Sequence, residues 1–154
     1  MEIKIIKGSI NYIDECVEAL IHSELGRTYF SEVDKAKKTL KEGFKDHDIY
    51  LAVDHKNNAL GFIWLIVNGI FHKHPYIHIV AVKSAYRGQG IGKMLLKHIE
   101  KLYLKDNVKL FLVVSDFNPN AKKMYQNLGY IEIGNLPNLY KQGITECLMM
   151  KSID

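Results

Sequence analysis

The chain has 154 residues, which is enough for one domain with a hydrophobic core and too few for two domains of the usual size. Hydrophobic residues make up 47% and charged residues 25%, a composition that excludes disordered, collagen-like and low-complexity proteins. The formal net charge of +4 suits an anionic ligand and is far from that of a polycation that packages nucleic acid. We therefore expect a single domain over residues 1–154.

The cysteines and the apolar segments indicate the cellular compartment in which the protein is expected. Cys16 and Cys147 lie too far apart for a metal knuckle and are too few for a disulfide framework, so we expect reduced thiols. The sequence after Met1 lacks the basic and apolar parts of a secretory signal. The most apolar segment, 59–67, is far shorter than the roughly 20 residues of a membrane helix. These features predict a cytoplasmic protein with no membrane partner.

The first half of the chain is predicted to form two helices and three strands. Apolar residues recur at helical spacing over 12–22. Ser31, followed three places on by Asp34, indicates the start of a second helix, and the lysine-rich segment that runs from there to Phe44 suits a surface helix. The expected strands are 3–6, 49–53 and 59–67, with the last two joined as an antiparallel hairpin by a turn at 56–58.

The second half is predicted to alternate strands and helices. The segment 91–102 carries one apolar stripe, which places that helix against a sheet, and Gly129 suits the C-terminal cap of a later helix. The expected order is strand 76–82, helix 91–102, strand 109–114, helix 119–127, and strands 130–134 and 145–151. This order predicts a mixed sheet with helices on both faces and a right-handed parallel crossover from 76–82 to 109–114.

A glycine-rich loop joins the strand 76–82 to the helix that follows it. Gly88, Gly90 and Gly92 allow a tight turn that leaves amide groups at the start of a helix, where phosphate binds well. The loop does not fit the dinucleotide fingerprint, because Lys93 stands where the third glycine should be. It does not fit a P-loop either, because Met94 takes the place of Ser or Thr. Without its neighbours, the loop is equally well explained as a plain tight turn.

The neighbouring residues point to a family. The run 79–92 resembles the acetyl-CoA-binding motif of the GNAT superfamily of N-acetyltransferases, whose core is represented by Arg87, Gly90 and Gly92. Ser84 departs from the proline of many members. The resemblance covers about residues 76–130. A second family element, Asn-x-x-Ala-x-x-hydrophobic-Tyr followed by Gly and an aromatic, is matched by Asn118, Ala121, Met124, Tyr125, Gly129 and Tyr130.

The resemblance implies both a fold and a reaction. The implied fold is α/β (α+β), with a mixed, mostly antiparallel sheet of six to seven strands, one splayed parallel pair and about four flanking helices. The implied reaction is acetyl-CoA-dependent N-acetyl transfer, in which a primary amine of a small molecule or a peptide attacks the thioester. Acetyl-CoA is the expected cosubstrate, and no metal is expected.

The resemblance also implies where coenzyme A binds. The pyrophosphate would rest on the amides of 88–93. The pantetheine arm would lie along the strand that ends at Val82 and pair with the main-chain groups of Val80 and Val82. Lys122 or Lys123 would add positive charge, unless these are ordinary solvated lysines. The residues expected to bind the cofactor are Val80, Ala81, Val82, Arg87, Gly88, Gln89, Gly90, Ile91, Gly92, Lys93, Asn118 and Tyr125.

Three residues are expected to take part in catalysis. Tyr125 would donate a proton to the leaving thiolate, and the amide of Val80 would stabilise the tetrahedral oxyanion. His78 is the expected general base, with Glu24 and His74 as weaker alternatives. For Tyr125 the alternative is a packed helix aromatic, and for His78 it is a hydrogen-bonded strand histidine.

Two further groups of residues are open to more than one interpretation. His72, His74 and His78 lie at alternate positions, but Pro75 is expected to interrupt the strand and no acidic or cysteine ligand completes a metal site. Several aromatics suit either the core or a substrate pocket, and we expect the stretch 26–30 to be a loop. These aromatics are Tyr29, Phe30, Trp64 and Phe71.

Two other classes of function compete with the enzyme. A non-catalytic module on the same fold would bind coenzyme A or a protein partner, although it would have little need of Tyr125. A nucleic-acid-binding domain would rest on the net charge alone and lacks stacking-aromatic motifs. The sequence leaves open the acceptor amine and the oligomeric state, a homodimer included.

Overall fold

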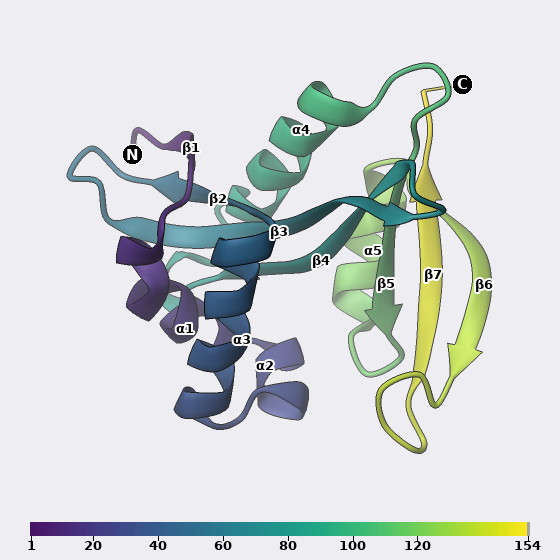
Figure 1. The fold of residues 1–154 in the computed structure, drawn as a ribbon, viewed down its shortest axis with the longest axis horizontal. Coiled ribbons are helices and arrows are strands. Elements are labelled where there is room, and N and C mark those ends of the chain that lie inside the picture. The colour runs from purple at the N-terminus through teal and green to yellow at the C-terminus, as the bar shows by residue number, and fades with distance from the viewer. Residues whose placement is uncertain (154) are drawn as a thin grey trace. The chain divides into compact units, whose positions relative to one another are not determined.

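A computed structural model describes residues 1–153 and contains five α-helices, two short 3-10 helices and seven strands in that range (Figure 1). The chain divides into two compact units: unit 1 holds residues 1–66 and 78–102, and unit 2 holds residues 67–77 and those from Tyr103 onward. The strands β3 and β4 each contribute to both units. The helices and strands are β1 (Lys4–Lys7), η1 (Ile10–Tyr12), α1 (Ile13–Ile21), α2 (Glu24–Tyr29), α3 (Val33–Asp46), β2 (Asp48–Val53), β3 (Ala59–Ile70), β4 (His74–Val82), η2 (Ser84–Tyr86), α4 (Ile91–Tyr103), β5 (Leu110–Ser115), α5 (Pro119–Asn127), β6 (Ile131–Pro137) and β7 (Thr145–Lys151).

The strands form a mixed sheet in the order β1-β2-β3-β4-β5-β7-β6. The predicted hairpin of β2 and β3 is confirmed as antiparallel. The predicted parallel pair is confirmed as β4 and β5, where Tyr76 lies opposite Phe111 and Ile77 opposite Leu112. The expected architecture, mostly antiparallel with one parallel pair, is therefore the one observed.

In unit 1, helices cover both faces of the strands. On one face α1 and α3 bury Leu20 and Leu40 against Leu51 and Phe62 in one hydrophobic cluster (Figure 1). Side chains alternate along a strand, so Tyr50 points to the other face, where its ring lies 5.2 Å from that of His98 in α4. The apolar stripe predicted for α4 is buried, as expected for a helix that lies against a sheet.

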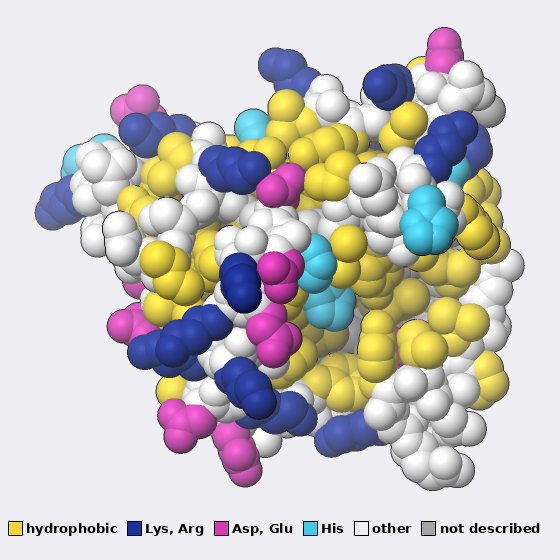
Figure 2. Space-filling view, viewed as in Figure 1, with side chains coloured by type: hydrophobic (Ala, Val, Ile, Leu, Met, Phe, Trp, Pro, Cys, Tyr) yellow, Lys and Arg dark blue, Asp and Glu magenta, His cyan; other side chains and the backbone are white. Residues whose placement is uncertain are grey.

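In unit 2, the strands run in the order β4-β5-β7-β6, and α5 lies behind them in Figure 1. Cross-strand pairs assign each side chain to a face. Leu112 lies opposite Met149 on the α5 side, whereas Phe111 lies opposite Met150 on the other side. Hydrophobic side chains gather on this second face, which is turned toward the viewer in Figure 2. Unit 2 therefore has one face covered by a helix and one face that displays side chains of its own strands.

Three local predictions are wrong. Residues 26–29 belong to helix α2 and do not form a loop, and only Phe30 lies beyond the helix end. The Ser23 hydroxyl caps that helix by accepting the Gly26 N–H at 2.9 Å. Ser31 does not begin the next helix, since α3 starts at Val33 with Glu32 at the capping position. Pro75 does not interrupt a strand but lies at a buried position within β4.

Of the residues that the structure describes, no helix combines the length and the hydropathy needed to cross a bilayer.

Candidate functional site

The end of β4 in unit 1 presents main-chain groups on an unshared edge. The Lys83 N–H donates to the Leu60 carbonyl of β3 at 2.8 Å. Alternate residues of an antiparallel strand point their main-chain groups to the same side, so Ala81 faces β3 too. A Cβ built on Gly61 would lie 2.8 Å from the Ala81 carbonyl oxygen, which confirms that close approach. Ala81 is therefore bonded within the sheet, and the intervening residues face the opposite edge.

Val80 and Val82 are those intervening residues. Burial alternates without interruption through β4, so no bulge reverses the direction of Val80. The Val82 carbonyl accepts a hydrogen bond from Arg87 Nε at 3.1 Å, outside the sheet. The pairing of β4 with β5 involves Tyr76 and Ile77, both of which precede Val80 in the chain. An extended ligand can therefore pair with Val80 and Val82 as an added strand would.

The glycine loop continues directly from this edge to α4. Gly88 and Gly90 have φ angles of +77° and +80°, which side chains of L-residues rarely allow. A Cβ built on either glycine would meet no atom within 4 Å, so space is open above the loop. The first turn of α4 closes when Met94 N–H donates to the Gly90 carbonyl at 2.9 Å. The amides of 91–93 precede that bond, so the helix does not use them and they are available to an anion.

Arg87 has a structural task beside this loop. Its guanidinium donates to the Val82 carbonyl at 3.1 Å and to the His22 carbonyl, at the end of α1, at 2.7 Å. Arg27 also donates to the His22 carbonyl, at 2.8 Å. Positive charge at the C-terminal end of a helix is favourable, because it complements the helix dipole. Arg87 thus ties the start of the loop to β4 and to α1, a role that the sequence did not reveal.

His78 lies in β4 among other aromatic rings of unit 1. Its ring meets Trp64 edge to face with a centroid distance of 4.8 Å, and Trp64 Nε1 donates to His47 Nδ1 at 3.1 Å. Burial lowers the pKa of His78 to about 4, with a smaller contribution from His47. His78 is therefore neutral at ordinary pH and can accept a proton, but it is a weaker base than an exposed imidazole.

Tyr125 lies on α5 in unit 2 and packs edge to face on Tyr130 at 5.9 Å between ring centroids. Burial raises the pKa of Tyr125 to about 12. The phenol consequently keeps its proton over the whole range in which an enzyme normally works. Such a group can donate a hydrogen bond or a proton to a thiolate.

Asn118 caps the helix that carries Tyr125. Its side-chain oxygen accepts the Ala121 N–H at 3.4 Å, and Pro119 follows in the first turn of α5. At the other end of α5, Gly129 has a φ of +97° and donates its N–H to the Gln126 carbonyl, as expected of a C-terminal cap. The second sequence element therefore defines the ends of one helix as well as its tyrosine.

The remaining candidates have other neighbours. Lys122 forms an ion pair with Glu132 of β6, whereas Lys93 is exposed beside the glycine loop. Glu24 pairs with Arg27 at 2.6 Å in α2. His74 accepts the Lys109 N–H at 3.1 Å and lines a polar pocket of unit 2. Within residues 1–153, no group of three or more His, Cys, Asp or Glu side chains is arranged to hold a metal ion.

The four aromatics considered for a substrate pocket lie in different surroundings. Trp64 belongs to the hydrophobic cluster of unit 1, and Phe30 packs against that cluster. Tyr29 ends helix α2. Phe71, in the turn between β3 and β4, is exposed and meets Phe111 edge to face. Of the two alternatives for these aromatics, Trp64 and Phe30 therefore serve the core.

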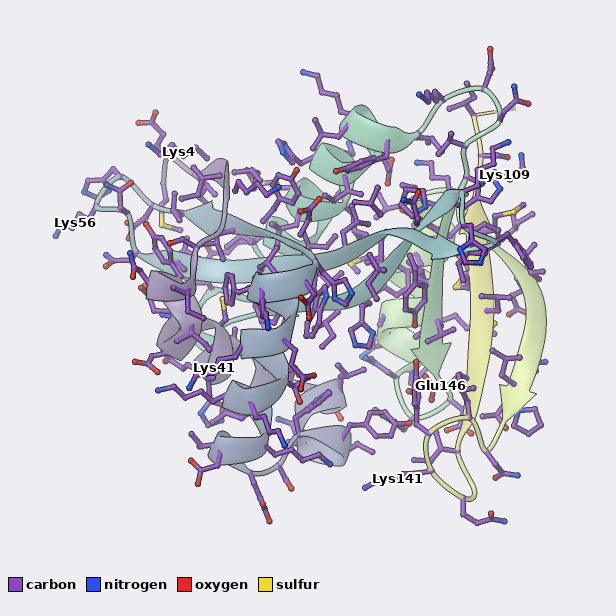
Figure 3. The ribbon with its side chains drawn as sticks, in the orientation of Figure 1. Lys4, Lys41, Lys56, Lys109, Lys141 and Glu146 are labelled. Carbon is purple, nitrogen blue, oxygen red and sulfur yellow. The ribbon has the colours of Figure 1, made fainter. Side chains whose placement is uncertain are left out.

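Sequence reasoning missed a buried pair of polar residues in unit 2. Glu146 at the start of β7 is 1% exposed, and both of its carboxylate oxygens lie 2.7 Å from the hydroxyl of Ser115 at the end of β5 (Figure 3). Ser115 and Glu146 are direct cross-strand partners. The sequence separates them by 31 positions, so no local motif joins them. A buried carboxylate is costly unless it has partners, which makes this pair a candidate for function.

The candidate site residues fall into the two units as follows. Unit 1 holds His78, Val80, Ala81, Val82, Arg87, Gly88, Gln89, Gly90, Ile91, Gly92 and Lys93, and unit 2 holds Ser115, Asn118, Tyr125 and Glu146.

Comparisons with known proteins agree with these features. Residues 18–130 match the family model described as "Acetyltransferase (GNAT) family". A mycothiol acetyltransferase from Renibacterium salmoninarum is 31% identical over 114 residues, which make up 71% of this chain and 33% of that protein. The chain thus spans about a third of the length of that curated relative.

Solved structures share the fold. An acetyltransferase of the GNAT family from Bacillus cereus superposes with a TM-score of 0.78 and 18% identity, covering 99% of this chain and 98% of that one. An aminoglycoside 6'-N-acetyltransferase complexed with coenzyme A gives a TM-score of 0.75 and 20% identity, covering 98% of this chain and 97% of that one. At this identity the likeness concerns the fold.

Proposed function

Because the chain belongs to the GNAT family of acetyltransferases, we propose that it is an acetyl-CoA-dependent N-acetyltransferase that acts on a primary amine of a small molecule or a peptide. The observation that carries the proposal is the glycine loop of unit 1. Gly88 and Gly90 leave open space above main-chain amides at the start of α4, next to the unshared edge of β4. These features fit a ligand with a diphosphate and an extended arm.

The same residues suggest how the ligand is held. The amides of 88–93 bind the diphosphate, and Lys93 adds positive charge beside the loop. Val80 and Val82 pair with the extended arm through main-chain groups that β3 does not use. Asn118 contributes to the site indirectly, because it caps α5, the helix that carries Tyr125. Gln89 and Ile91 contribute through their main chain.

The proposed chemistry divides the proton transfers between two side chains. The bound thioester supplies the acetyl group and a thiolate leaving group. His78 accepts the proton of the attacking amine, directly or through water, since its imidazole is neutral above about pH 4. The Val80 N–H donates to the oxyanion, and Tyr125 provides the proton for the thiolate, which its raised pKa keeps available. A cytoplasmic location and a single domain over 1–154 remain predictions of the same proposal.

Two measurements test this function. Calorimetry with the purified chain should show saturable binding of acetyl-CoA, and a panel of amines, polyamines, amino acids and peptide amino termini should include substrates that release the thiol of coenzyme A. Absence of binding would contradict the proposal as a whole. Binding without thiol release for any amine would favour the non-catalytic module.

A further inference from the structure

Glu146 lies on the face of unit 2 that α5 does not cover. Ser115 and Phe111 stand on that face of β5, and their cross-strand partners Glu146 and Met150 stand on the same face of β7. Glu132, by contrast, lies opposite Met149 on the α5 side. The carboxylate is therefore part of the face whose side chains Figure 2 shows as largely hydrophobic.

Two tyrosines of unit 2 have neighbouring hydroxyl groups, namely Tyr76 in β4 and Tyr140 in the segment between β6 and β7. The hydroxyl groups of Tyr76 and Tyr140 are 3.4 Å apart, and Tyr140 is 51% exposed. Tyr76 stands opposite Phe111 in the parallel pair, so its ring is on the same face. Burial raises the pKa of Tyr76, and the nearby Tyr140 and Glu146 raise it further. The Tyr76 phenol is therefore neutral, and the charge of Glu146 helps to keep it so.

The chemistry of this group selects one class of ligand. A carboxylate in an apolar surrounding interacts far more strongly with a positive charge than it would in water. Hydroxyl oxygens accept hydrogen bonds from an ammonium group, and tyrosine rings attract cations through their faces. An anion would be repelled by Glu146. A primary alkylammonium group, which carries one charge, three N–H donors and an apolar chain, matches the carboxylate, the hydroxyls and the hydrophobic face.

We propose that Glu146, Ser115, Tyr76 and Tyr140 form the site that binds the ammonium group of the acceptor substrate. The acceptor is then an alkylamine that arrives protonated, and Glu146 is its counter-charge, held in place by the Ser115 hydroxyl. This assignment rests on the proposed function, because it concerns where the acceptor amine binds, whereas the glycine loop of unit 1 is the proposed site for the diphosphate. Glu146 is thus a residue for substrate binding and specificity.

The opposite end of the β5–β7 pair is less suited to an amine. Lys73, Lys109 and Asp106 line the polar pocket there, so its positive charges outnumber its negative charge. Lys109 precedes the start of β5, whereas Glu146 pairs with the last residue of β5 (Figure 3). The positive charges of Lys73 and Lys109 would repel an ammonium group. Charge therefore favours the Glu146 end of unit 2 for an alkylamine.

An NMR titration tests the site without requiring acetyl transfer. The full chain labelled with ¹⁵N is titrated with n-butylammonium chloride and, separately, with 1-butanol, which has the same chain length without the charge. We expect butylammonium to shift the amides of Ser115 and Glu146 saturably, and butanol to shift them weakly. Equal shifts from both compounds, or shifts confined to other residues, would overturn the proposal whether or not any variant folds.

A second test removes the negative charge of Glu146 by substitution. Glu146→Gln should weaken butylammonium binding at least about tenfold, because a charge-assisted hydrogen bond is lost. Glu146→Asp keeps the charge and should retain more of the affinity. The matched control is Glu132→Gln, which removes a carboxylate on the α5 side of the same strands. An unchanged affinity in folded Glu146→Gln would refute the assignment.

Steady-state kinetics then separate the two proposals. In Glu146→Gln the KM for the amine should rise at least about tenfold while the affinity for acetyl-CoA stays the same. If butylammonium binds at Glu146 but no amine releases thiol, the ammonium site is supported and acetyl transfer is not. If thiol is released and the KM of Glu146→Gln equals that of the wild type, acetyl transfer stands and the ammonium site fails.

Discussion

Units 1 and 2 prepare the proposed reaction in different ways. In unit 1 the key groups are main-chain amides and carbonyls, presented by the end of β4 and by Gly88 and Gly90. In unit 2 they are side chains, namely Tyr125 on α5 and the Ser115–Glu146 pair across β5 and β7. Main-chain groups recognise features that are common to many ligands, such as a diphosphate. Side chains on a sheet face can change one at a time, which suits recognition of a particular acceptor.

The largest effect that tests this difference is expected at Gly90. Gly90→Asp places a Cβ and a negative charge in the open space above the amides, so acetyl-CoA should bind more than about 100-fold more weakly by calorimetry. Gly143→Asp is the matched control, because Gly143 also has a positive φ, at +84°, and open space around it. Unchanged affinity in Gly90→Asp would show that unit 1 does not bind the diphosphate with this loop.

His78 should make unit 1 sensitive to acid. The unfolded chain protonates His78 below its ordinary pKa of 6.5, whereas the folded chain keeps it neutral down to about pH 4. Stability is therefore lost as pH falls through that window, by up to about 3 kcal/mol from this residue. Urea unfolding at pH 7 and at pH 4 measures how much of the free energy of unfolding is lost on acidification. That loss should be smaller in His78→Phe than in the wild type. The control is His55→Gln, at an exposed position, which should lose as much stability between pH 7 and pH 4 as the wild type does. If His78→Phe also loses as much stability as the wild type, the lowered pKa of His78 is contradicted.

Tyr125 tests whether a side chain of unit 2 acts in the chemical step. Tyr125→Phe keeps the packing on Tyr130 but removes the donor, so kcat should fall about tenfold to 100-fold while acetyl-CoA affinity is little changed. Tyr130→Phe is the control for packing and should have the smaller effect on kcat. Equal kcat values for wild type and Tyr125→Phe would leave the tyrosine a packing residue only.

The smallest effect is expected at Asn118. Asn118→Ala removes the cap of α5 and should lower the free energy of unfolding by about 1 kcal/mol, as measured in urea. Asn118→Ser or Asn118→Asp, which can cap a helix too, should restore most of that loss. If these variants are as unstable as Asn118→Ala, the residue contributes to unit 2 through another contact.

Local patterns predicted the elements whose ends carry their own signals. The helix 119–127 and the strand 145–151 were predicted with the ends that the structure shows, since Pro119 and Gly129 mark the limits of that helix. The glycine loop could also be recognised from the sequence, because Arg87, Gly90 and Gly92 lie within six consecutive residues. A signal of this kind depends on neighbours in the chain and needs no knowledge of distant contacts.

Long-range packing decided the features that sequence reasoning missed. Pro75 was expected to break a strand, yet it is buried within β4. Ser115 and Glu146 gave no signal, because only the register of β5 with β7 makes them partners. The guanidinium of Arg87 likewise reaches His22, which lies 65 positions away. Contacts of this range arise when strands pair and helices dock.

The amino-acid sequence by itself determined the family, the order of most helices and strands, and the loop expected to bind a diphosphate. Tertiary structure alone decided that the Arg87 guanidinium reaches the His22 carbonyl, and that the Glu146 carboxylate is buried beside the Ser115 hydroxyl. The physical reason is the range of the interactions. Caps, turns and helix starts are satisfied by residues a few positions apart, whereas strand register and burial bring together residues that the chain keeps far apart.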